Sequence, residues 1–388
     1  MSMTSVPLDV LTDAAATIPV RNAWYMLLYA WNMARFRGRW PVETETSPSL
    51  LGLLARILSS ATRDLLRRQL GRSFALRSRT IRGIRGRIDL AASLKRFTFQ
   101  HGAAHCIFSE LSVDTLKNRI LRATLQRLAS DPRLRHADAV KEAGMRHELR
   151  VLVRDLEKVQ LVSISSVDFS RLQLGRNDRD YAVPLAICAL VHHLEMPTEA
   201  VGDHAIFALL RDEITFHQLF ERFVRNFCRF HYPLCDVGPE TLNWPDDLEC
   251  ELVPAMRTDV TISEKDPPYH RLIIDTKYYA SALSPSLYGE EKFRAENLYQ
   301  LYAYLRTQEH RGSSHQTASG MLLYPTTRRE LNEVMSVQGH RMRVATLNLA
   351  APWKSIESTL KSLVLAELQA SHRHRHQLST VVGPEEIH

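Results

Sequence analysis

Residues 256–262 read MRTDVTI, and residues 271–279 read RLIIDTKYY. Both segments are rich in the β-branched and apolar residues that favour strands. Side chains alternate between the two faces of a strand, so Asp275 and Lys277 share one face. The polar, proline-containing connection at 263–268 is typical of a turn between antiparallel strands. The stretch therefore predicts two paired strands that carry an acidic residue and then Asp-x-Lys.

Pairing of these strands would bring Asp259 towards Asp275. Two carboxylates at short distance repel each other unless a cation lies between them, and Mg²⁺ is a hard cation that prefers oxygen ligands. An ammonium such as that of Lys277 can orient the attacking water, while the metal neutralises charge growing on a phosphate. The pattern predicts a metal-dependent phosphodiesterase site. The triplet alone is weak evidence, because such triplets arise by chance roughly once or twice in a chain of this length, and an exposed edge pair is the alternative.

Two helical patterns flank the strands. Residues 219–227 carry an apolar stripe at three- and four-residue spacing, and Glu221 lies off that stripe, where it is either a third acidic ligand or a solvated helix residue. Gln300 and Tyr304 lie four residues apart and share a helix face in the segment 297–304. An acidic helix, Asp, Asp-x-Lys and Gln-x-x-x-Tyr follow each other in the order of the PD-(D/E)XK nucleases, particularly their RecB-like branch.

Further segments make the resemblance closer. Residues 18–31 read IPVRNAWYMLLYAW and are similar to the opening signature of the McrC family, the nuclease subunits of McrBC restriction systems. The resemblance covers roughly residues 17–365 in the correct order. One departure is Thr258, which stands where the superfamily's name-giving proline precedes the first Asp. The other matching segments are 84–89, 114–121, 256–262, 273–279 and 291–301.

The McrC resemblance implies an endonuclease subunit that binds no nucleotide itself. Its implied partner is a McrB-like AAA+ GTPase hexamer that recognises double-stranded DNA with modified cytosine (5-methylcytosine). The N-terminal part of McrC enters the motor ring and stimulates GTP hydrolysis. Carried over to this chain, the resemblance implies Mg²⁺ on Asp259 and Asp275, with Glu221 as the candidate third ligand. Lys277 would position the water, and Gln300 and Tyr304 complete the predicted catalytic set.

The charge distribution adds candidates for DNA or partner contact. The formal charge is +7, from 50 Lys and Arg against 43 Asp and Glu, which permits a polyanionic partner without proving one. Arginines crowd the segment 72–87, where phosphate contact, a solvated sheet edge and an acidic motor surface remain open interpretations. Two further candidates, in the N-terminal signature, rest on position alone. The candidates are Arg21, Asn22, Arg77, Arg79, Arg85 and Arg87.

The remaining composition favours a cytoplasmic protein. We find no run of apolar residues of membrane-spanning length and no signal-peptide pattern. Five cysteines without Cys-x-x-Cys spacing are typical of reduced structural thiols, and a zinc site from Cys228, His231, Cys235 and Cys250 is a minor alternative. The sequence has neither a phosphate-binding Gly-x-x-x-x-Gly-Lys loop nor a dinucleotide-binding glycine motif, so we expect no nucleotide cofactor.

We predict a mixed α+β chain. Residues 1–17 are expected to be flexible, and an N-terminal domain of helices and a small sheet that contacts the GTPase is expected at 18–203. A nuclease domain with a central mixed sheet flanked by helices is expected at 204–370, and a disordered tail at 371–388. A buried helix should begin near Asn22 as its N-cap, and short strands should fill 73–113.

Three functional hypotheses follow. The first is the endonuclease subunit of a GTP-driven, modification-dependent restriction complex. The second is a non-catalytic adaptor that only activates the motor, which intact Asp259, Asp275 and Lys277 argue against. The third is a stand-alone RecB-like repair nuclease, which has no need of the N-terminal signature.

Overall fold

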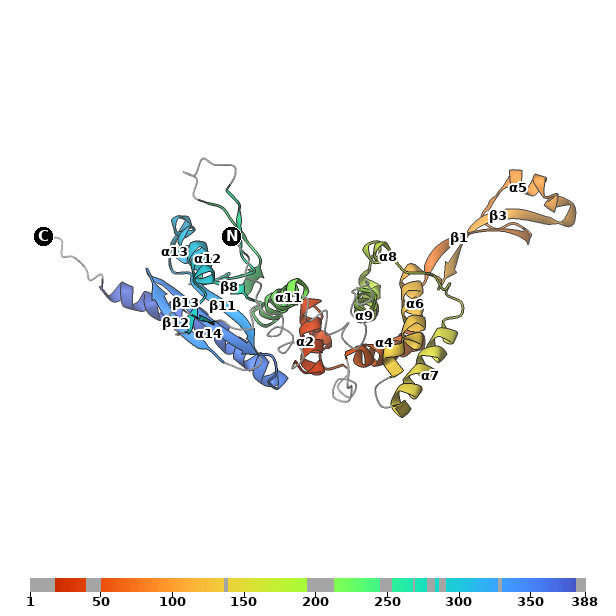
Figure 1. The fold of residues 1–388 in the computed structure, drawn as a ribbon. Helices are drawn as coiled ribbons and strands as arrows, with labels where there is room; N and C mark the ends of the chain where they lie inside the picture. Colours follow the sequence, from red (N-terminus) through yellow and green to blue (C-terminus); the bar gives the residue numbers. More distant parts are fainter. Residues whose placement is uncertain are drawn as a thin grey trace, which may run out of the picture. The chain divides into compact units, whose positions relative to one another are not determined.

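The computed structural model describes residues 18–39, 50–135, 139–193, 213–244, 253–267, 269–277, 283–285, 291–326 and 330–381. The chain forms two compact units (Figure 1). The first contains Met1–Thr46 and Asp203–His388, and the second contains Ser47–Gly202. The predicted flexible segment 1–17 lies outside the described residues.

A mixed six-stranded sheet forms the centre of the first unit, with strand order β12-β13-β11-β8-β7-β4. β13, β11 and β8 run parallel, whereas β12, β7 and β4 pair antiparallel to their neighbours. This arrangement confirms the predicted mixed α+β fold with a central mixed sheet. The strands are β4 (Cys235–Gly238), β7 (Val260–Glu264), β8 (Arg271–Thr276), β11 (Ser319–Thr326), β12 (Asn332–Val337) and β13 (His340–Asn348).

Helices pack on this sheet through their apolar stripes. α12 packs against β8 and β11, α14 against β8, β11 and β13, and α11 against β4, β7 and β8. Two small two-stranded sheets accompany them, β5 with β6 and β9 with β10. The bounds are α11 (Glu213–His231), α12 (Ala295–Arg306), α13 (Ser313–Gln316), α14 (Trp353–Val381), η5 (Glu309–Arg311), β5 (Thr241–Leu242), β6 (Met256–Arg257), β9 (Leu283–Pro285) and β10 (Glu291–Phe293). α14 continues beyond residue 371, where the sequence predicted a disordered tail.

The N-terminal helix α2 (Val20–Ala30) belongs to the unit that contains the six-stranded sheet. It packs on α11, and the buried Tyr29 ring lies 5.1 Å from the ring of Phe227 and 5.8 Å from that of Trp353. The helix is buried core, as predicted from its nearly continuous apolar sequence. Residues 18–46 therefore separate from the rest of the predicted 18–203 domain, because their aromatic side chains pack on helices far along the chain. A 3₁₀ turn, η1 (Ala34–Phe36), follows α2.

Asn22 is not the N-cap that the sequence suggested. The helix begins at Val20 with Pro19 as its N-cap, so Asn22 lies inside the first turn. Its side chain is fully buried, and Nδ2 donates 2.8 Å hydrogen bonds to the carbonyl oxygens of Leu349 and Ala351. Asn22 therefore joins α2 to the turn that precedes α14.

The second unit is a group of packed helices from which an arm extends (Figure 1). Its helices and 3₁₀ turns outside the arm follow one another along the chain. They are α4 (Leu50–Arg67), α6 (Leu116–Ser130), η3 (Pro132–Arg135), α7 (Ala139–Asp155), α8 (Ser166–Ser170), η4 (Arg176–Tyr181) and α9 (Ala182–His193). Among the described residues, no helix is long and apolar enough to cross a membrane.

The arm is residues 73–112 of the second unit. Its frame is β1 (Ser73–Arg82) paired antiparallel with β3 (Ala103–Ser112), and β2 (Arg87–Ile88) pairs with the other edge of β3. The sequence predicted strands throughout, but α5 (Leu90–Lys95) and η2 (Thr98–His101) interrupt them, and the Asp89 side chain caps α5 by accepting from the Ala92 N–H. Gly86 turns the chain at a φ of +69°, where an added Cβ would lie 2.4 Å from the Ile107 carbonyl oxygen.

We expect the Asn22 hydrogen bonds to contribute to stability because both acceptors would be left without their partner by truncation. Asn22→Ala should lower the free energy of unfolding by about 2–4 kcal/mol, measured by urea denaturation. Gln218→Ala, at an exposed position on α11, is the matched control and should change it by less than about 0.5 kcal/mol. Equal stability of the two variants would contradict a stabilising role for Asn22.

Candidate active site

Asp259 and Asp275 are brought together by strand pairing. β7 and β8 are antiparallel, as predicted, and Val260 is registered with Ile274. One residue further along the same register, Asp259 stands opposite Asp275. The residues Asp259 and Asp275 thus lie at the end of the hairpin remote from its turn.

Asp275 is only 2% exposed and lies beside Lys277. Its Oδ2 is 2.7 Å from Lys277 Nζ, although the angle does not make a hydrogen bond, and Oδ2 has no other partner among the described residues. Burial raises the pKa of Asp275 to about 6, the Asp259 charge adds to that rise, and the Lys277 ammonium opposes it. A buried carboxylate with an unsatisfied oxygen is suited to binding a cation.

Gln300 and Tyr304 fix Lys277 from α12. Lys277 Nζ donates to Gln300 Oε1 at 2.6 Å, and Gln300 Nε2 donates to the Tyr304 hydroxyl at 2.6 Å. Tyr304 in turn donates to the Arg257 carbonyl oxygen at 2.9 Å. The structure therefore brings Gln300 and Tyr304 onto one helix face beside Lys277, where the four-residue spacing predicted them to be. The chain of hydrogen bonds ties the ammonium to the segment that precedes Asp259.

Thr276 is a residue at the site that the sequence analysis missed. Its backbone N–H and its hydroxyl both donate to Asp259 Oδ2, at 2.7 and 2.6 Å. This engagement leaves the other oxygen, Oδ1, as the available ligand atom of Asp259. Strand alternation pointed Thr276 away from Asp275, and no local pattern in the sequence indicated that it would reach the neighbouring strand.

Glu221 is not part of a three-residue acidic cluster. Its carboxylate accepts a 2.6 Å hydrogen bond from Arg225, one turn along α11. In the described part of the chain, no three His, Cys, Asp or Glu side chains come together in a way that could hold a metal ion. Arg225 engages Glu221 in this structure, and the role of Glu221 as a third ligand stays a prediction.

His217 is the α11 residue that acts on Asp275. Its Nε2 lies 3.1 Å from the Thr276 carbonyl oxygen, and its charge would lower the pKa of Asp275. His217 precedes Glu221 by four residues and so shares its helix face. The four-residue spacing from Glu221 is the sequence signal that could have indicated His217.

The donor set fits one small divalent cation. Asp259 and Asp275 supply carboxylate oxygens on adjacent strands, which are the ligands that Mg²⁺ prefers, and water commonly completes its shell. The unsatisfied Asp275 Oδ2 is the observation that favours a cation here. The minor zinc alternative gains no support, because burial raises the pKa of the Cys228 and Cys235 thiols and His231 bonds Tyr29. Cys250 lies outside the described residues.

The remaining predicted contact residues lie apart from the carboxylates in the chain. Arg21 is half-buried on α2, and Asn22 is fully buried there. On the arm, three arginines surround Glu110, whose carboxylate lies 2.9 Å from Arg79, 3.8 Å from Arg85 and 4.0 Å from Arg77. The Arg87 side chain is exposed on β2.

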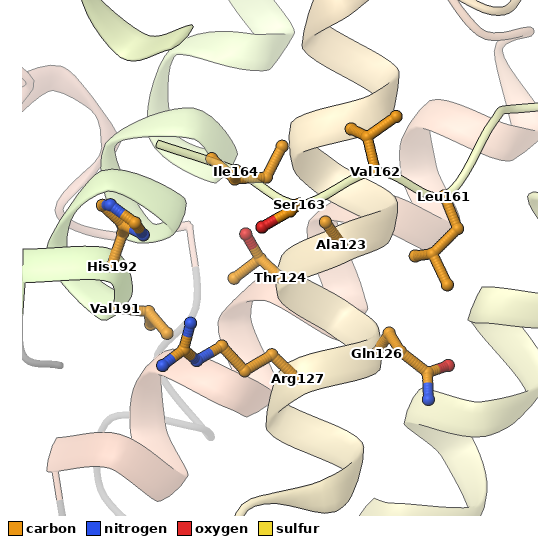
Figure 2. Close-up of a pocket in the computed structure, with 10 residues that line it drawn as sticks. All are labelled: Ala123, Thr124, Gln126, Arg127, Leu161, Val162, Ser163, Ile164, Val191 and His192. Atoms are coloured by element: carbon orange, nitrogen blue, oxygen red, sulfur yellow. The ribbon is translucent and has the colours of Figure 1, made fainter. Parts of the chain in front are cut away.

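A cavity of about 480 Å³ lies in the second unit (Figure 2). Its wall comes from α6, from the end of α9 and from the extended segment 161–164, with Thr124, Arg127 and His192 among the lining side chains. None of the predicted catalytic residues lines it. The cavity is therefore not the phosphodiesterase site that the sequence predicted.

The raised pKa of Asp275 predicts a pH-dependent stability. Without metal, the native state keeps this proton up to about pH 6, whereas the unfolded chain loses it near 3.8, so stability falls as pH rises through that window. Asp275→Asn removes the effect, while Lys277 keeps Gln300 as a partner. In EDTA at pH 8 the free energy of unfolding of the variant should exceed that of the parent by about 1–3 kcal/mol. At pH 3.5 the two proteins should have the same free energy of unfolding. A pH-independent difference between them would contradict the assignment.

Similarity to known proteins extends along most of the chain. A family model described as McrBC 5-methylcytosine restriction system component matches residues 15–325. The Type IV methyl-directed restriction enzyme EcoKMcrBC of Escherichia coli (strain K12) is 30% identical over 347 residues, which cover 88% of this chain and 96% of that protein.

A solved structure shares the fold. It is a refined half-complex from a tetradecameric assembly of Thermococcus gammatolerans McrB AAA+ hexamers with bound McrC. The match has a TM-score of 0.55 at 16% identity and covers 89% of this chain and 75% of that chain. Since the family model spans most of the sequence and the bacterial relative nearly all of it, the chain belongs to the family of McrBC 5-methylcytosine restriction system components.

Proposed function

We propose that this chain is the Mg²⁺-dependent DNA endonuclease subunit of a GTP-driven restriction complex directed against 5-methylcytosine. The observation that carries the proposal is the buried Asp275, with an unsatisfied oxygen, between Asp259 and Lys277. A purely structural ion pair between Asp275 and Lys277 would need no second carboxylate beside it. Membership of the restriction family supplies the substrate class.

Asp259 and Asp275 would hold the metal. When bound, Mg²⁺ supplies charge neutralisation at the phosphate and lowers the pKa of a bound water. Thr276 fixes Asp259 through Oδ2 and leaves Oδ1 for the cation. His217 holds the Thr276 carbonyl, so the backbone between Asp275 and Lys277 is braced from α11.

Lys277 would position the attacking water. Its ammonium donates to Gln300 Oε1 and forms an ion pair with the Asp275 carboxylate, so at least one of its three N–H groups can face a water beside the metal. Tyr304 and Gln300 restrict the rotation of the lysine, and a restricted donor loses less entropy when the reaction geometry forms. These residues act by orientation, and no side chain serves as a covalent nucleophile.

The partner proposed for this chain is a McrB-like AAA+ GTPase hexamer. The archaeal structure of similar fold contains McrB AAA+ hexamers with bound McrC, and the bacterial relative is named as a methyl-directed enzyme. Recognition of double-stranded DNA with modified cytosine would then reside with the partner. We assign the complex to the cytoplasm, in keeping with the free thiols of the described cysteines.

The arm supports a protein partner through its apolar surface. Phe74 and Leu76 on β1 are 74% and 75% exposed, and Leu111 stands directly opposite Phe74 on β3. Exposed apolar clusters on a soluble protein mark interaction sites more often than chance. Further exposed apolar side chains lie towards the tip: Ile84, Leu90, Leu94, Phe97 and Phe99.

Loss of one carboxylate should separate the two activities of the complex. We expect Asp275→Asn to reduce cleavage of methylated DNA by roughly a thousandfold with Mg²⁺, GTP and the GTPase present, because the metal ligand is lost. Stimulation of GTP hydrolysis should be unchanged, because the arm is intact. Gel analysis of a methylated plasmid and phosphate release would measure the two rates.

Asp266→Asn, at an exposed position in the turn of the same hairpin, is the matched control for that experiment. It should cleave at the parental rate. If Asp275→Asn cleaves DNA at the parental rate, the nuclease assignment is wrong. If the parent chain stimulates GTP hydrolysis but cleaves no DNA, the non-catalytic adaptor is favoured. Cleavage by the chain alone would favour the stand-alone nuclease.

A charge on the apolar face of the arm should weaken the partner complex. Leu76→Asp places a carboxylate where we expect an apolar contact, and loss of such an anchor costs about 1–3 kcal/mol, or tenfold and more in the concentration for half-maximal GTPase stimulation. Unfolding should be unaffected because the position is exposed. Leu161→Asp, at an exposed leucine outside the arm, is the control. Equal titration curves for the two variants would argue against the arm as the contact.

A further inference from the structure

The arm is joined to the helices of the second unit at two neighbouring points. Gly71 lies just before the arm and Val113 just after it, so these two residues mark its ends. The first residues of the arm are registered with the last, Ser73 with Ser112. Among the described elements, β1 and β3 pack chiefly on each other, on β2, on α5 and on η2, so the direction of the arm depends on how its two ends are held.

One buried amide holds both ends. Asn118 lies in the first turn of α6 and is fully buried. Its Nδ2 donates to the Gly71 carbonyl oxygen at 3.0 Å and to the Val113 carbonyl oxygen at 2.7 Å. Both donors of the amide are therefore used, one on each end of the arm.

Tyr181 makes a second connection from η4. Its hydroxyl donates to Asn118 Oδ1 at 2.7 Å and accepts from the Gly71 N–H at 2.8 Å. Lys117 pairs with Asp178, and its Nζ lies 4.8 Å from the centre of the Tyr181 ring. A Cβ added to Gly71 would lie 2.6 Å from the end of the Lys117 side chain, which would have to move.

The exit of the arm is fixed in the same manner. Asp114 accepts two 2.7 Å hydrogen bonds from Arg119 and a third from the Gln160 N–H at 2.9 Å. The polar side chains of segment 114–119 named here therefore bond to other groups of the second unit. None of Asp114, Lys117 or Asn118 is free to contact DNA or a partner through the groups named here.

We propose that Asn118 is a positioning residue that locks the direction of the arm relative to α6. The inference rests on the proposed function only where the arm is taken to meet the GTPase; the lock itself is a property of this chain. Because one amide bonds Gly71 and Val113 together, loss of its donors removes a hydrogen bond from both ends at once. The arm would then sample many directions, and only a fraction of molecules would present it correctly.

Asn118→Asp is the sharpest test of the lock. The change is isosteric and keeps an acceptor for Tyr181, but it removes both N–H donors and places carboxylate oxygens against two carbonyl oxygens. Spin labels at Gln100 on the arm and Gln126 on α6, both exposed, would report the arm's direction by double electron–electron resonance. Cys235 and Cys250 would be replaced by serine to prevent unwanted labelling.

The parent protein should give one narrow distance distribution and Asn118→Asp a broad one. If a tenth of the molecules hold the arm correctly, about tenfold more protein is needed for half-maximal GTPase stimulation, with the plateau unchanged. Leu76→Asp should weaken stimulation while keeping the narrow distribution, because it alters only the arm's surface. Asn226→Asp, which puts the same change at a buried asparagine bonded to the Ala30 carbonyl, controls for burying a carboxylate.

A narrow distribution in Asn118→Asp overturns the proposal. A broad distribution in a system where the parent chain stimulates no GTP hydrolysis keeps the lock and rejects the proposed partner function. If Asn118→Asp fails to fold, Tyr181→Phe removes the hydroxyl that bridges Gly71 and Asn118 but keeps the ring beside Lys117. That milder variant should broaden the distribution by a smaller amount, and an unchanged distribution would again overturn the lock.

Discussion

The antiparallel pairing of β7 with β8 is the constraint on which the catalytic half of the molecule depends. It forces Asp259 and Asp275 to face each other, and the surrounding sheet buries Asp275 almost completely. Burying a carboxylate that faces a second carboxylate is unfavourable unless the negative charge is compensated. Lys277 compensates part of the charge, while burial and the Asp259 charge still raise the pKa of Asp275. This imbalance supports the proposed cation at the site.

A second constraint comes from aromatic packing between α2 and α11. Tyr29 lies among Phe223, Phe227 and Trp353, and Arg37 donates to its buried hydroxyl at 2.6 Å. Because α2 is part of the unit that contains the central sheet, the whole second unit lies between two segments of the first along the sequence. Correct folding of the nuclease unit therefore requires the chain on both sides of the inserted helices and arm.

The comparison of sequence with structure separates local signals from distant ones. The strands, the hairpin and the Gln300–Tyr304 face follow from alternation and helical spacing, which are local properties, and the structure contains all of them. Asn22 was misjudged because its partners lie more than 320 residues away, at Leu349 and Ala351. His217 was overlooked beside Glu221, because helical spacing gives a shared face but not which residue approaches the sheet. Thr276 could not be found, since its role depends on the position of a neighbouring strand.

The strand register explains why arginines are concentrated on one side of the arm. Arg77 and Arg79 stand opposite Phe108 and Cys106, on the side of the sheet where the small core of the arm lies. The Arg85 guanidinium lies 4.4 Å from the centre of the Phe108 ring, and Glu110 draws all three arginines over that core.

Long cationic side chains commonly cover apolar surface with their stems while the charged end stays in water. Arginine content alone is therefore weaker evidence for phosphate contact than the sequence suggested, because a 40-residue arm with so few core residues needs such a cover. On the opposite side of the same strands, Phe74 and Leu76 are left exposed. The asymmetry favours a protein surface, rather than DNA, as the counterpart of the arm.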